Sequence, residues 1–312
     1  MPINHLPEKE SDNIPGKEKK NKIISFRISQ PQYSLDDVIL SDSVREELDN
    51  ALSLIKYNDL IFNKWGLNTV IKHHNLCINL YGPSGTGKTM TAHGIAKELN
   101  KDLVIVNYAE LESKYVGETS KNLVALFEYA RANDVVVLFD EADAMLSKRV
   151  TSMQNATDVS ANQTRNTLLK LLDEYEGVVT FTTNFIQNFD SAFFRRIFTH
   201  IKFELPDENA RRKIWEHYLI QQLPVTERGA LIDRISKVEN LTGADISTIV
   251  LKAAIMAANK GKSISYSDVS DYASKIAQSK SDMNGGYEIT TRKVTEEYAL
   301  KQIRKGEKNG NT

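Results

Sequence analysis

The chain has 312 residues, of which 41% are hydrophobic and 26% are charged. This mix is typical of soluble globular proteins and supplies enough apolar material for about two domains. The longest apolar run, Ala253–Ala258, is far shorter than the roughly 20 residues that span a membrane. The net charge of −1 gives no basic footprint for nucleic acid. The single cysteine, Cys77, cannot form an intrachain disulfide, which is typical of a reducing compartment. We therefore expect a cytoplasmic protein that binds neither membrane nor nucleic acid.

The first part of the chain reads as a disordered leader followed by an α/β domain. Residues 1–22 are polar and charged and lack an apolar pattern, which predicts disorder. From residue 23 to 205, short apolar runs alternate with stretches of helical period, a pattern that favours a parallel sheet with helices on both faces. The predicted strands are Cys77–Tyr81, Leu103–Val106, Val135–Phe139, Val178–Thr183 and Ile201–Leu205. The predicted helices between them include Met90–Leu99, Ser120–Ala132 and Thr164–Tyr175.

After Pro206 only helical periodicity is visible. Residues 206–279 therefore predict a small all-α domain. Its expected helices are Glu208–Gln221, Glu227–Val238, Ala244–Asn259 and Tyr266–Gln278. Residues 280–312 are rich in Gly, Lys, Asn and Thr, and we expect them to form a mobile tail.

The strongest motif follows the first predicted strand. It matches G-x-x-x-x-G-K-[ST], in which glycines let successive backbone N–H groups point at phosphate oxygens. The lysine, Lys88, supplies positive charge for the β- and γ-phosphates, and the Thr89 hydroxyl can ligate Mg²⁺. The motif consists of Gly82, Pro83, Ser84, Gly85, Thr86, Gly87, Lys88 and Thr89. It predicts a site for ATP and Mg²⁺ at the start of a helix, and we place Met90 in that site as well.

An acidic pair closes the apolar run Val135–Phe139. A continuous apolar run is typical of a central strand buried on both faces, and the carboxyl ends of such strands are where doubly wound sheets build sites. Asp140 is placed to hold Mg²⁺, and Glu141 can polarise the attacking water. Together with the phosphate loop, the pair predicts ATP hydrolysis to ADP and phosphate.

With these motifs the chain resembles the AAA+ ATPase family, in the branch that contains katanin, spastin, the sorting-complex disassembly ATPase and the proteasomal ATPases. The resemblance covers roughly residues 33–278. Residues 34–40, Ser-Leu-Asp-Asp-Val-Ile-Leu, are similar to the family's adenine-contacting linker, which implies nucleotide contacts at Val38 and Ile39. Phe181-Thr182-Thr183-Asn184 resembles the first sensor, so Asn184 would orient the lytic water. Gly243-Ala244 resembles the start of the family's lid helix and would approach the nucleotide.

Two further segments resemble parts of the family that act beyond one subunit's own site. Residues 114–119, Lys-Tyr-Val-Gly-Glu-Thr, are similar to the central-pore loop, which implies that Tyr115 and Val116 grip extended polypeptide. Residues 190–196, Asp-Ser-Ala-Phe-Phe-Arg-Arg, resemble the region whose arginines reach the neighbouring subunit's γ-phosphate. Arg196 is the first finger candidate and Arg195 the second. The sequence departs from the family at residues 199–200, where Thr and His replace a basic pair.

The resemblance implies a ring motor, a homohexamer, that pulls a protein substrate through a central pore, with targets arriving by a flexible end or an adaptor. One candidate substrate class is the HORMA-domain proteins remodelled by the pachytene-checkpoint ATPases, since we expect no N-terminal domain before residue 23. The pore-loop and lid-helix motifs look more like the katanin branch. The alternative is a DNA-associated AAA+ switch of the initiator or clamp-loader type, which predicts a basic surface or an added DNA-binding fold.

Overall fold

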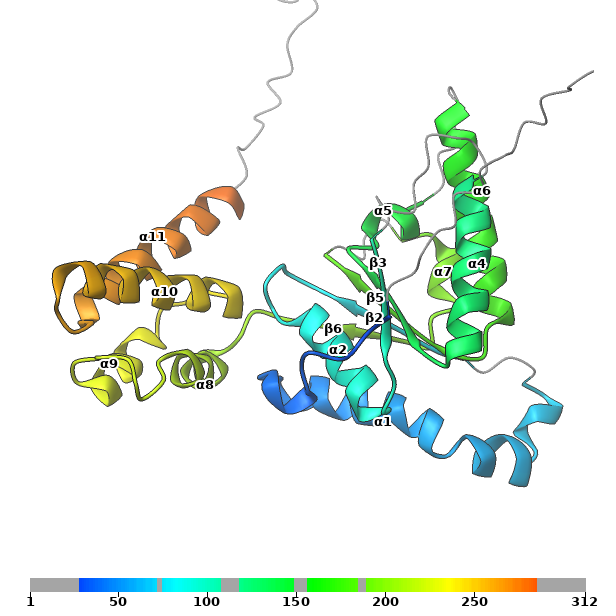
Figure 1. Cartoon of the computed structure of the whole chain (residues 1–312), viewed down its shortest axis with the longest axis horizontal. Helices are drawn as coiled ribbons and strands as arrows, with labels where there is room; N and C mark the ends of the chain where they lie inside the picture. Colours follow the sequence, from blue (N-terminus) through cyan, green and yellow to red (C-terminus); the bar gives the residue numbers. More distant parts are fainter. Residues whose placement is uncertain (1–27, 72–74, 108–117, 149–155, 185–188, 285–312) are drawn as a thin grey trace, which may run out of the picture.

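The computed structural model describes residues 28–71, 75–107, 118–148, 156–184 and 189–284 (Figure 1). The predicted leader, residues 1–22, and most of the predicted tail therefore lie outside the described residues. Helix α11 (Tyr266–Asn284) runs past residue 280, where we had expected the tail to begin. In the part of the chain that is described, the strands form a six-stranded sheet in the order β1-β3-β4-β5-β2-β6. Their bounds are β1 Ile28–Ser29, β2 Leu76–Tyr81, β3 Leu103–Asn107, β4 Val136–Asp140, β5 Val178–Thr183 and β6 Thr199–Lys202.

The predicted parallel sheet is confirmed: β3, β4, β5, β2 and β6 run parallel, and only the two-residue edge strand β1 is antiparallel. The last strand differs from the prediction of Ile201–Leu205, because it covers Thr199–Lys202. Its partner β2 ends at Tyr81, where the chain turns into the phosphate loop. The Phe203 N–H still donates to the Tyr81 carbonyl at 2.7 Å, and beyond it the chain has no strand to pair with.

Helices cover both faces of the sheet (Figure 1). On one face, α1 (Asp42–Lys56) and α2 (Lys88–Glu98) pack against alternate strand residues such as Ile78 and Leu80. On the other face lie α4 (Glu118–Asn133), α5 (Asp143–Leu146), α6 (Ala156–Glu174) and α7 (Ser191–Phe194), over the intervening residues such as Val137 and Phe181. A strand alternates its side chains between faces, so two separate cores follow from one sheet.

Short turns connect these elements. A 3-10 turn, Leu35–Asp37, precedes α1, and a π-helical turn, Asp59–Lys64, and a second 3-10 turn, Leu67–Thr69, follow it. The sequence analysis did not identify α1, although its buried residues Val44, Leu48, Ala51 and Leu52 follow a helical spacing.

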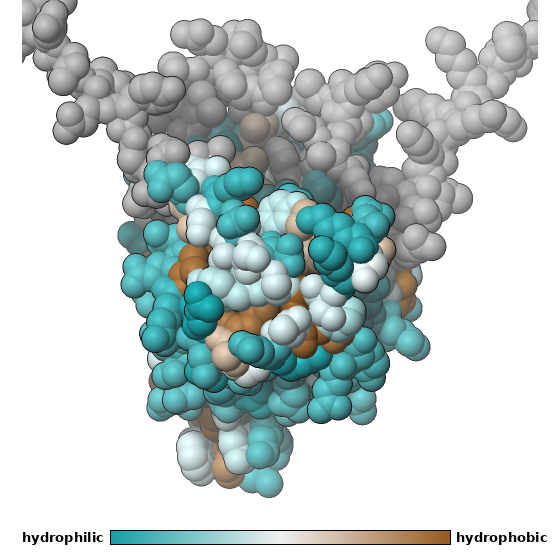
Figure 2. Space-filling model, turned by 90° about the vertical axis from the view of Figure 1, so that its left-hand side faces the viewer, coloured by the Kyte–Doolittle hydropathy of each residue, from teal (hydrophilic) through white to brown (hydrophobic). Residues whose placement is uncertain are grey.

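The predicted all-α part follows the sheet as helices α8 (Glu208–Tyr218), α9 (Arg228–Ile235), α10 (Gly243–Lys260) and α11. They enclose their own core around the fully buried Trp215 and Ile249. Hydrophilic side chains surround small apolar areas on the outer end of the molecule that these helices form (Figure 2). Within the described ranges, no helix is both long enough and apolar enough to cross a membrane.

Candidate functional site

The loop from Gly82 to Gly87 joins the end of β2 to the start of α2, and its backbone conformation needs glycine. Gly82, Gly85 and Gly87 have φ values of +141°, +78° and +100°, a region that residues with a Cβ rarely adopt. A Cβ on Gly82 would lie 2.0 Å from the Phe203 carbonyl oxygen. The loop therefore packs directly against Phe203, the residue that follows β6, and then continues into the first turn of α2. Backbone N–H groups at the start of a helix are suited to binding phosphate.

Lys88 is the first residue of α2 and is buried, and its ammonium group binds backbone carbonyls of the loop. Its Nζ donates to the carbonyls of Gly82 at 2.7 Å and Pro83 at 2.8 Å, and to the Asn184 Oδ1 at 3.1 Å. Burial lowers the pKa of Lys88, while the carboxylates of Asp143, Asp140 and Glu141 oppose that shift. The cation is thus held among oxygen atoms next to the loop that would carry phosphate.

The acidic pair lies at the end of β4, where the sequence places it. The Thr89 hydroxyl donates to Asp140 Oδ1 at 2.9 Å, and the Thr182 hydroxyl on β5 donates to the same oxygen. The Glu141 N–H donates to Thr182 Oγ1 at 3.0 Å. Glu141 has φ +53° and an exposed side chain, so its backbone turns the carboxylate out of the strand towards solvent.

Asn184 follows β5 and connects the acidic pair to the loop. Its N–H donates to both carboxylate oxygens of Asp143, at 3.0 and 3.2 Å, and its Oδ1 accepts from Lys88. The sequence analysis singled out neither Asp143 nor Thr182 as a site residue. The only available signal was their closeness in sequence to Glu141 and Asn184, because their partners lie on neighbouring strands.

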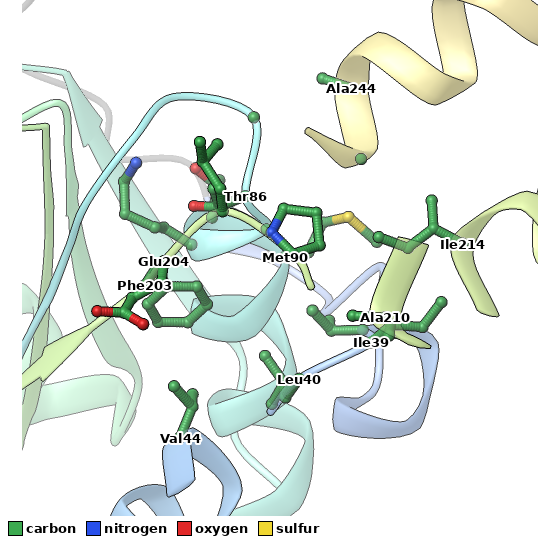
Figure 3. A pocket seen from close by; sticks show the side chains of 18 of the residues that line it. Ile39, Leu40, Val44, Thr86, Met90, Phe203, Glu204, Ala210, Ile214 and Ala244 are labelled. Atoms are coloured by element: carbon green, nitrogen blue, oxygen red, sulfur yellow. The ribbon is translucent and has the colours of Figure 1, made fainter. Parts of the chain in front are cut away.

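A cavity of about 820 Å³ lies between the sheet and the helices that follow it (Figure 3). The predicted residues that line it are 84–90, Val38, Ile39, Asp140, Glu141, Asn184, Gly243 and Ala244. Gly82 and Pro83 do not line it, but their carbonyls hold Lys88. The structure thus brings residues from both predicted domains to one cavity.

Apolar side chains gather at one end of the cavity. Figure 3 shows Ile39, Met90, Ile214 and Ala210 around this end, from the segment before α1, from α2 and from α8. His217 and Tyr218 of α8 also line the cavity. The sequence analysis did not identify the α8 residues, because their helix pattern shows only which residues are apolar, not which cavity they face.

The start of α10 touches the phosphate loop directly. The Ala244 N–H donates to the Gly85 carbonyl at 3.3 Å. A capping box fixes this helix start: the Asp245 N–H donates to Thr242 Oγ1 at 3.3 Å, and Thr242 N–H and O–H both donate to the Asp245 carboxylate. Lys280 of α11 binds the same carboxylate.

The two arginines that directly follow α7 differ in their surroundings. Arg196 forms a two-pronged ion pair with Asp173 of α6, with both N–O distances 2.8 Å, and donates to the Ala192 carbonyl. The side chain of Arg195 is exposed and has no hydrogen-bond or ion-pair partner among the described residues. Tyr115 and Val116 lie outside the described residues.

The residues present fit a nucleotide with Mg²⁺. The Thr89 hydroxyl and the Asp140 carboxylate are oxygen ligands 2.9 Å apart, and Mg²⁺ is commonly held by one or two protein oxygens together with phosphates and water. No cluster of three or more His, Cys, Asp or Glu side chains that could hold a metal occurs in the described part of the chain. The described lining of the cavity also contains no arginine.

Comparison with known proteins agrees with this geometry. The chain is 34% identical over 240 residues to a 26S proteasome regulatory subunit homolog of Methanocaldococcus jannaschii, covering 75% of this chain and 60% of that protein. It is 28% identical over 277 residues to a proteasome-activating nucleotidase of Methanococcus maripaludis, covering 85% of this chain and 65% of that protein. It is 36% identical over 188 residues to the vesicular-fusion protein SEC18 of Candida albicans, covering 54% of this chain and 23% of that protein. The chain thus spans less than two thirds of the length of these relatives.

Solved structures of the FIGL-1 AAA domain share the fold. One is 23% identical with a TM-score of 0.63 and covers 81% of this chain and 85% of its own. The other, a complex with ADP, is 21% identical with a TM-score of 0.64 and covers 83% and 91%. Residues 78–205 match the model of the ATPase family associated with various cellular activities (AAA). Residues 78–205 therefore belong to a nucleotide-binding ATPase domain of the AAA family.

Proposed function

We propose that the chain is a Mg²⁺-dependent ATPase that assembles with copies of itself into a ring and remodels, unfolds or disassembles a protein substrate. The relatives named above as a proteasome-activating nucleotidase and a vesicular-fusion protein support the class of function. The observation that carries the proposal is a site with Lys88, the Asp140–Glu141 pair and Asn184 in place, whose described lining lacks an arginine. The missing arginine is a reason to expect a second copy.

Each residue of the site has a proposed role in hydrolysis. When bound, magnesium and ATP supply the electrophilic phosphorus and a cation that neutralises its charge. Lys88 and the loop N–H groups bind the phosphates, while Thr89 and Asp140 hold the metal. The exposed Glu141 carboxylate accepts a proton from the attacking water, and Asn184 orients that water.

We infer that Arg195 rather than Arg196 is the residue that reaches the neighbouring nucleotide. Arg196 is held by Asp173 in a two-pronged ion pair, a geometry that costs free energy to break. Arg195 is exposed at the C-terminal end of α7, a helix that lies beside α6 on the side of the sheet away from α8 and α10 (Figure 1). It therefore cannot serve the cavity of its own chain. This reverses the order of the two candidates that the sequence alone favoured.

Mixing two inactive variants tests whether Arg195 acts across an interface. Lys88→Ala removes phosphate binding but keeps Arg195. Arg195→Ala removes the arginine but keeps an intact cavity. Each variant alone should therefore hydrolyse ATP slowly. In mixed assemblies an intact Arg195 can lie beside an intact cavity, and we expect ATPase activity to recover. A mixture no more active than the sum of its parts would show that Arg195 does not act in trans.

Size analysis of Glu141→Gln tests assembly itself. Removing the proton acceptor should leave ATP bound and trap the assembled state, so mass-resolved chromatography with Mg·ATP should show a mass near six subunits and co-purified protein. A monomer or dimer with and without nucleotide would instead favour a nucleotide switch, such as the DNA-associated type. A variant that hydrolyses ATP at the parent rate would remove Glu141 from its role.

Pulling through a pore is tested by Tyr115→Ala. The variant should keep basal ATPase activity and lose remodelling of the co-purified protein, because an aromatic side chain would supply the grip on an extended chain. Unchanged remodelling would exclude this loop as the grip. The HORMA-domain substrate and the adaptor stay predictions from the sequence.

A further inference from the structure

A polar chain, buried at Asn79 and Thr183 and half-buried at His200, runs across three strands on the face of the sheet that α7 covers. Asn79 of β2 is fully buried and lies opposite His200 of β6. The Asn79 Nδ2 and the His200 Nδ1 are 3.3 Å apart, and the Thr183 hydroxyl of β5 donates to the Asn79 Oδ1 at 3.2 Å. The His200 Nε2 lies 3.3 Å from the Phe194 carbonyl oxygen. The contacts thus connect β5 to the last residue of α7.

The donors and acceptors in this chain fit only one assignment. Because the Asn79 Oδ1 accepts from Thr183, its Nδ2 must be the donor towards His200. The His200 Nδ1 then accepts, and its Nε2–H donates to the Phe194 carbonyl. Burial lowers the pKa of His200, against a smaller opposing effect of the Phe194 hydrogen bond, so the ring is neutral at pH 7. A neutral imidazole supplies the one acceptor and one donor that the chain needs.

Aromatic contacts fix the position of the His200 ring. It stacks on the Phe194 ring with centroids 4.1 Å apart and an interplanar angle of 13°, and meets Phe189 edge to face at 5.9 Å. Phe194 contributes both its ring and its carbonyl to the same histidine. The end of α7 is therefore held to β6 by two kinds of contact at once.

Both ends of this polar chain adjoin residues of the ATPase site. Thr183 is followed by Asn184, whose Oδ1 accepts from Lys88. Phe194 is followed by Arg195, whose N–H group shares its peptide unit with the Phe194 carbonyl that His200 binds. Three hydrogen bonds thus connect Thr183, the residue before Asn184, to the peptide bond between Phe194 and Arg195.

We propose that His200 is a positioning residue, which holds the peptide that begins Arg195 in a fixed relation to the end of β5. The inference rests on the proposed role of Arg195 towards a neighbouring nucleotide. A displaced Phe194 carbonyl would let α7 shift, and a shift of about 1 Å in a reacting group can lower a rate by up to about a hundredfold. His200 is not among the residues that line the cavity, so we expect its effect on turnover and not on nucleotide binding.

Three substitutions of His200 separate positioning from folding. His200→Phe keeps a ring to stack on Phe194 and removes both hydrogen bonds. His200→Gln gives up the ring but supplies one acceptor and one donor, as the neutral imidazole does. His200→Asn keeps an acceptor near Asn79, which satisfies that buried amide, but is too short to reach the Phe194 carbonyl. Thermal unfolding of each variant reports on the fold.

Steady-state ATPase kinetics of the full chain give the test. We expect His200→Phe and His200→Asn to lower kcat by about ten- to a hundredfold with KM within about twofold of the parent, and His200→Gln to stay near the parent in both. A purely packing role predicts the opposite order, with Phe better than Gln. Parent-like kcat for Asn, or equal losses for Gln and Phe, would overturn the proposal.

The same variants in an Arg195→Ala background distinguish this inference from the function on which it rests. If His200 acts through Arg195, His200→Asn should cause no further loss of kcat once Arg195 is absent. Equal fold losses in both backgrounds would overturn the positioning role while leaving Arg195 in place. If Arg195→Ala alone keeps the parent kcat, the proposed role of Arg195 fails, whatever His200 does.

Discussion

At the scale of single residues, the Thr182 hydroxyl forms hydrogen bonds with both members of the acidic pair, Asp140 and Glu141. Thr182 Oγ donates to the Asp140 carboxylate and accepts from the Glu141 N–H at 3.0 Å. It therefore fixes the carboxylate that we propose to hold the metal and the backbone that directs the proposed proton acceptor. Such supporting hydrogen bonds keep a site's own ligands oriented, and losing one typically costs about 10- to 100-fold in activity.

Thr182→Val keeps the shape of the side chain and removes the hydroxyl. We expect kcat for ATP to fall by about 10- to 100-fold, while a fluorescent ATP analogue binds with nearly unchanged affinity in the absence of Mg²⁺. Thr180→Val on the same strand is the matched control, because the buried Thr180 hydroxyl has no partner among the described residues. That control should keep kcat and gain about 1 kcal/mol in unfolding free energy. Equal kcat values for the two variants would contradict the role of Thr182.

Gly82 has the least room for a side chain. A Cβ there would meet the Phe203 carbonyl oxygen at 2.0 Å, and its φ of +141° is unfavourable for alanine. Gly82→Ala should lower the free energy of unfolding by at least about 2 kcal/mol, measured by urea denaturation. Gly243→Ala is the control, since its Cβ would lie 3.6 Å from the Gly85 carbonyl, and its unfolding free energy should stay within about 0.5 kcal/mol. A loss of less than about 0.5 kcal/mol for Gly82→Ala would show that the loop tolerates a side chain at Gly82.

The sequence predicted the residues of the site that form contiguous motifs, and not those that support them from elsewhere. The spacing of Lys88 and Thr89 to the loop glycines is local, so a single stretch of sequence reveals it. Thr182 and Asp143 contact the site because β5 lies beside β4. The sequence of neither segment specifies that these two strands are neighbours. The sequence could not show that Arg196 forms an ion pair with Asp173, which lies on a different helix.

At the scale of elements, the capped start of α10 connects the last four helices to the phosphate loop. Thr242 caps this helix with Asp245, and in the same first turn the Ala244 N–H donates to the Gly85 carbonyl. Burial alone would raise the pKa of Asp245, but Lys280 and Thr242 together hold it below its ordinary value. The cap is thus an ionised carboxylate at a helix N-terminus, an arrangement that the helix dipole favours.

Thr242→Ala should lower unfolding free energy by about 1 kcal/mol and also weaken ATP binding, because the α10 start would no longer be fixed against Gly85. Ser265→Ala is the matched control. Ser265 caps α11 with Asp268 through the same pattern of hydrogen bonds but does not line the cavity. It should show the loss in stability, seen in thermal unfolding, and no change in ATP affinity by calorimetry. Weakened ATP binding in both variants would mean that stability alone accounts for it.

The elements most fully predicted are the long or strongly patterned ones. Strand Val178–Thr183 was predicted with the bounds that the structure shows, because a continuous apolar run in a parallel sheet is buried on both faces. Strand β1 has two residues and pairs only at the edge, so it has no period to detect. The bounds of β6 depend on where its partner β2 ends, which its own sequence does not contain.

At the scale of the whole molecule, the ATPase site depends on contacts between parts far apart in the chain. The segment before α1, the loop after β2, the strand ends of β4 and β5 and the start of α10 all line one cavity. The two cores on the faces of the sheet and the third core among α8–α11 hold these parts in place. Rotation of the last four helices would therefore change the cavity without disturbing either sheet core.

The charge state of buried histidines makes the stability of the whole molecule depend on pH. Burial lowers the pKa of His93 from its ordinary value near 6.5, against the attraction of Asp140, and the pKa of His200 is lowered by burial as well. The His93 Nδ1 accepts the Gln32 N–H at 3.3 Å, which fits a neutral ring. As pH falls through about 6.5, the unfolded chain therefore binds protons that the folded chain does not, and the fold loses stability.

We expect the urea midpoint of unfolding to be flat above about pH 7.5 and to fall steadily between about pH 6.5 and 5. His93→Asn keeps an acceptor for the Gln32 N–H and cannot be protonated, so its midpoint should fall less steeply over the same range. Its stability at pH 8 can be lower than the parent's without affecting this comparison, because the slope with pH counts only the protons taken up on unfolding. A slope equal to the parent's would show that His93 carries no part of the pH dependence.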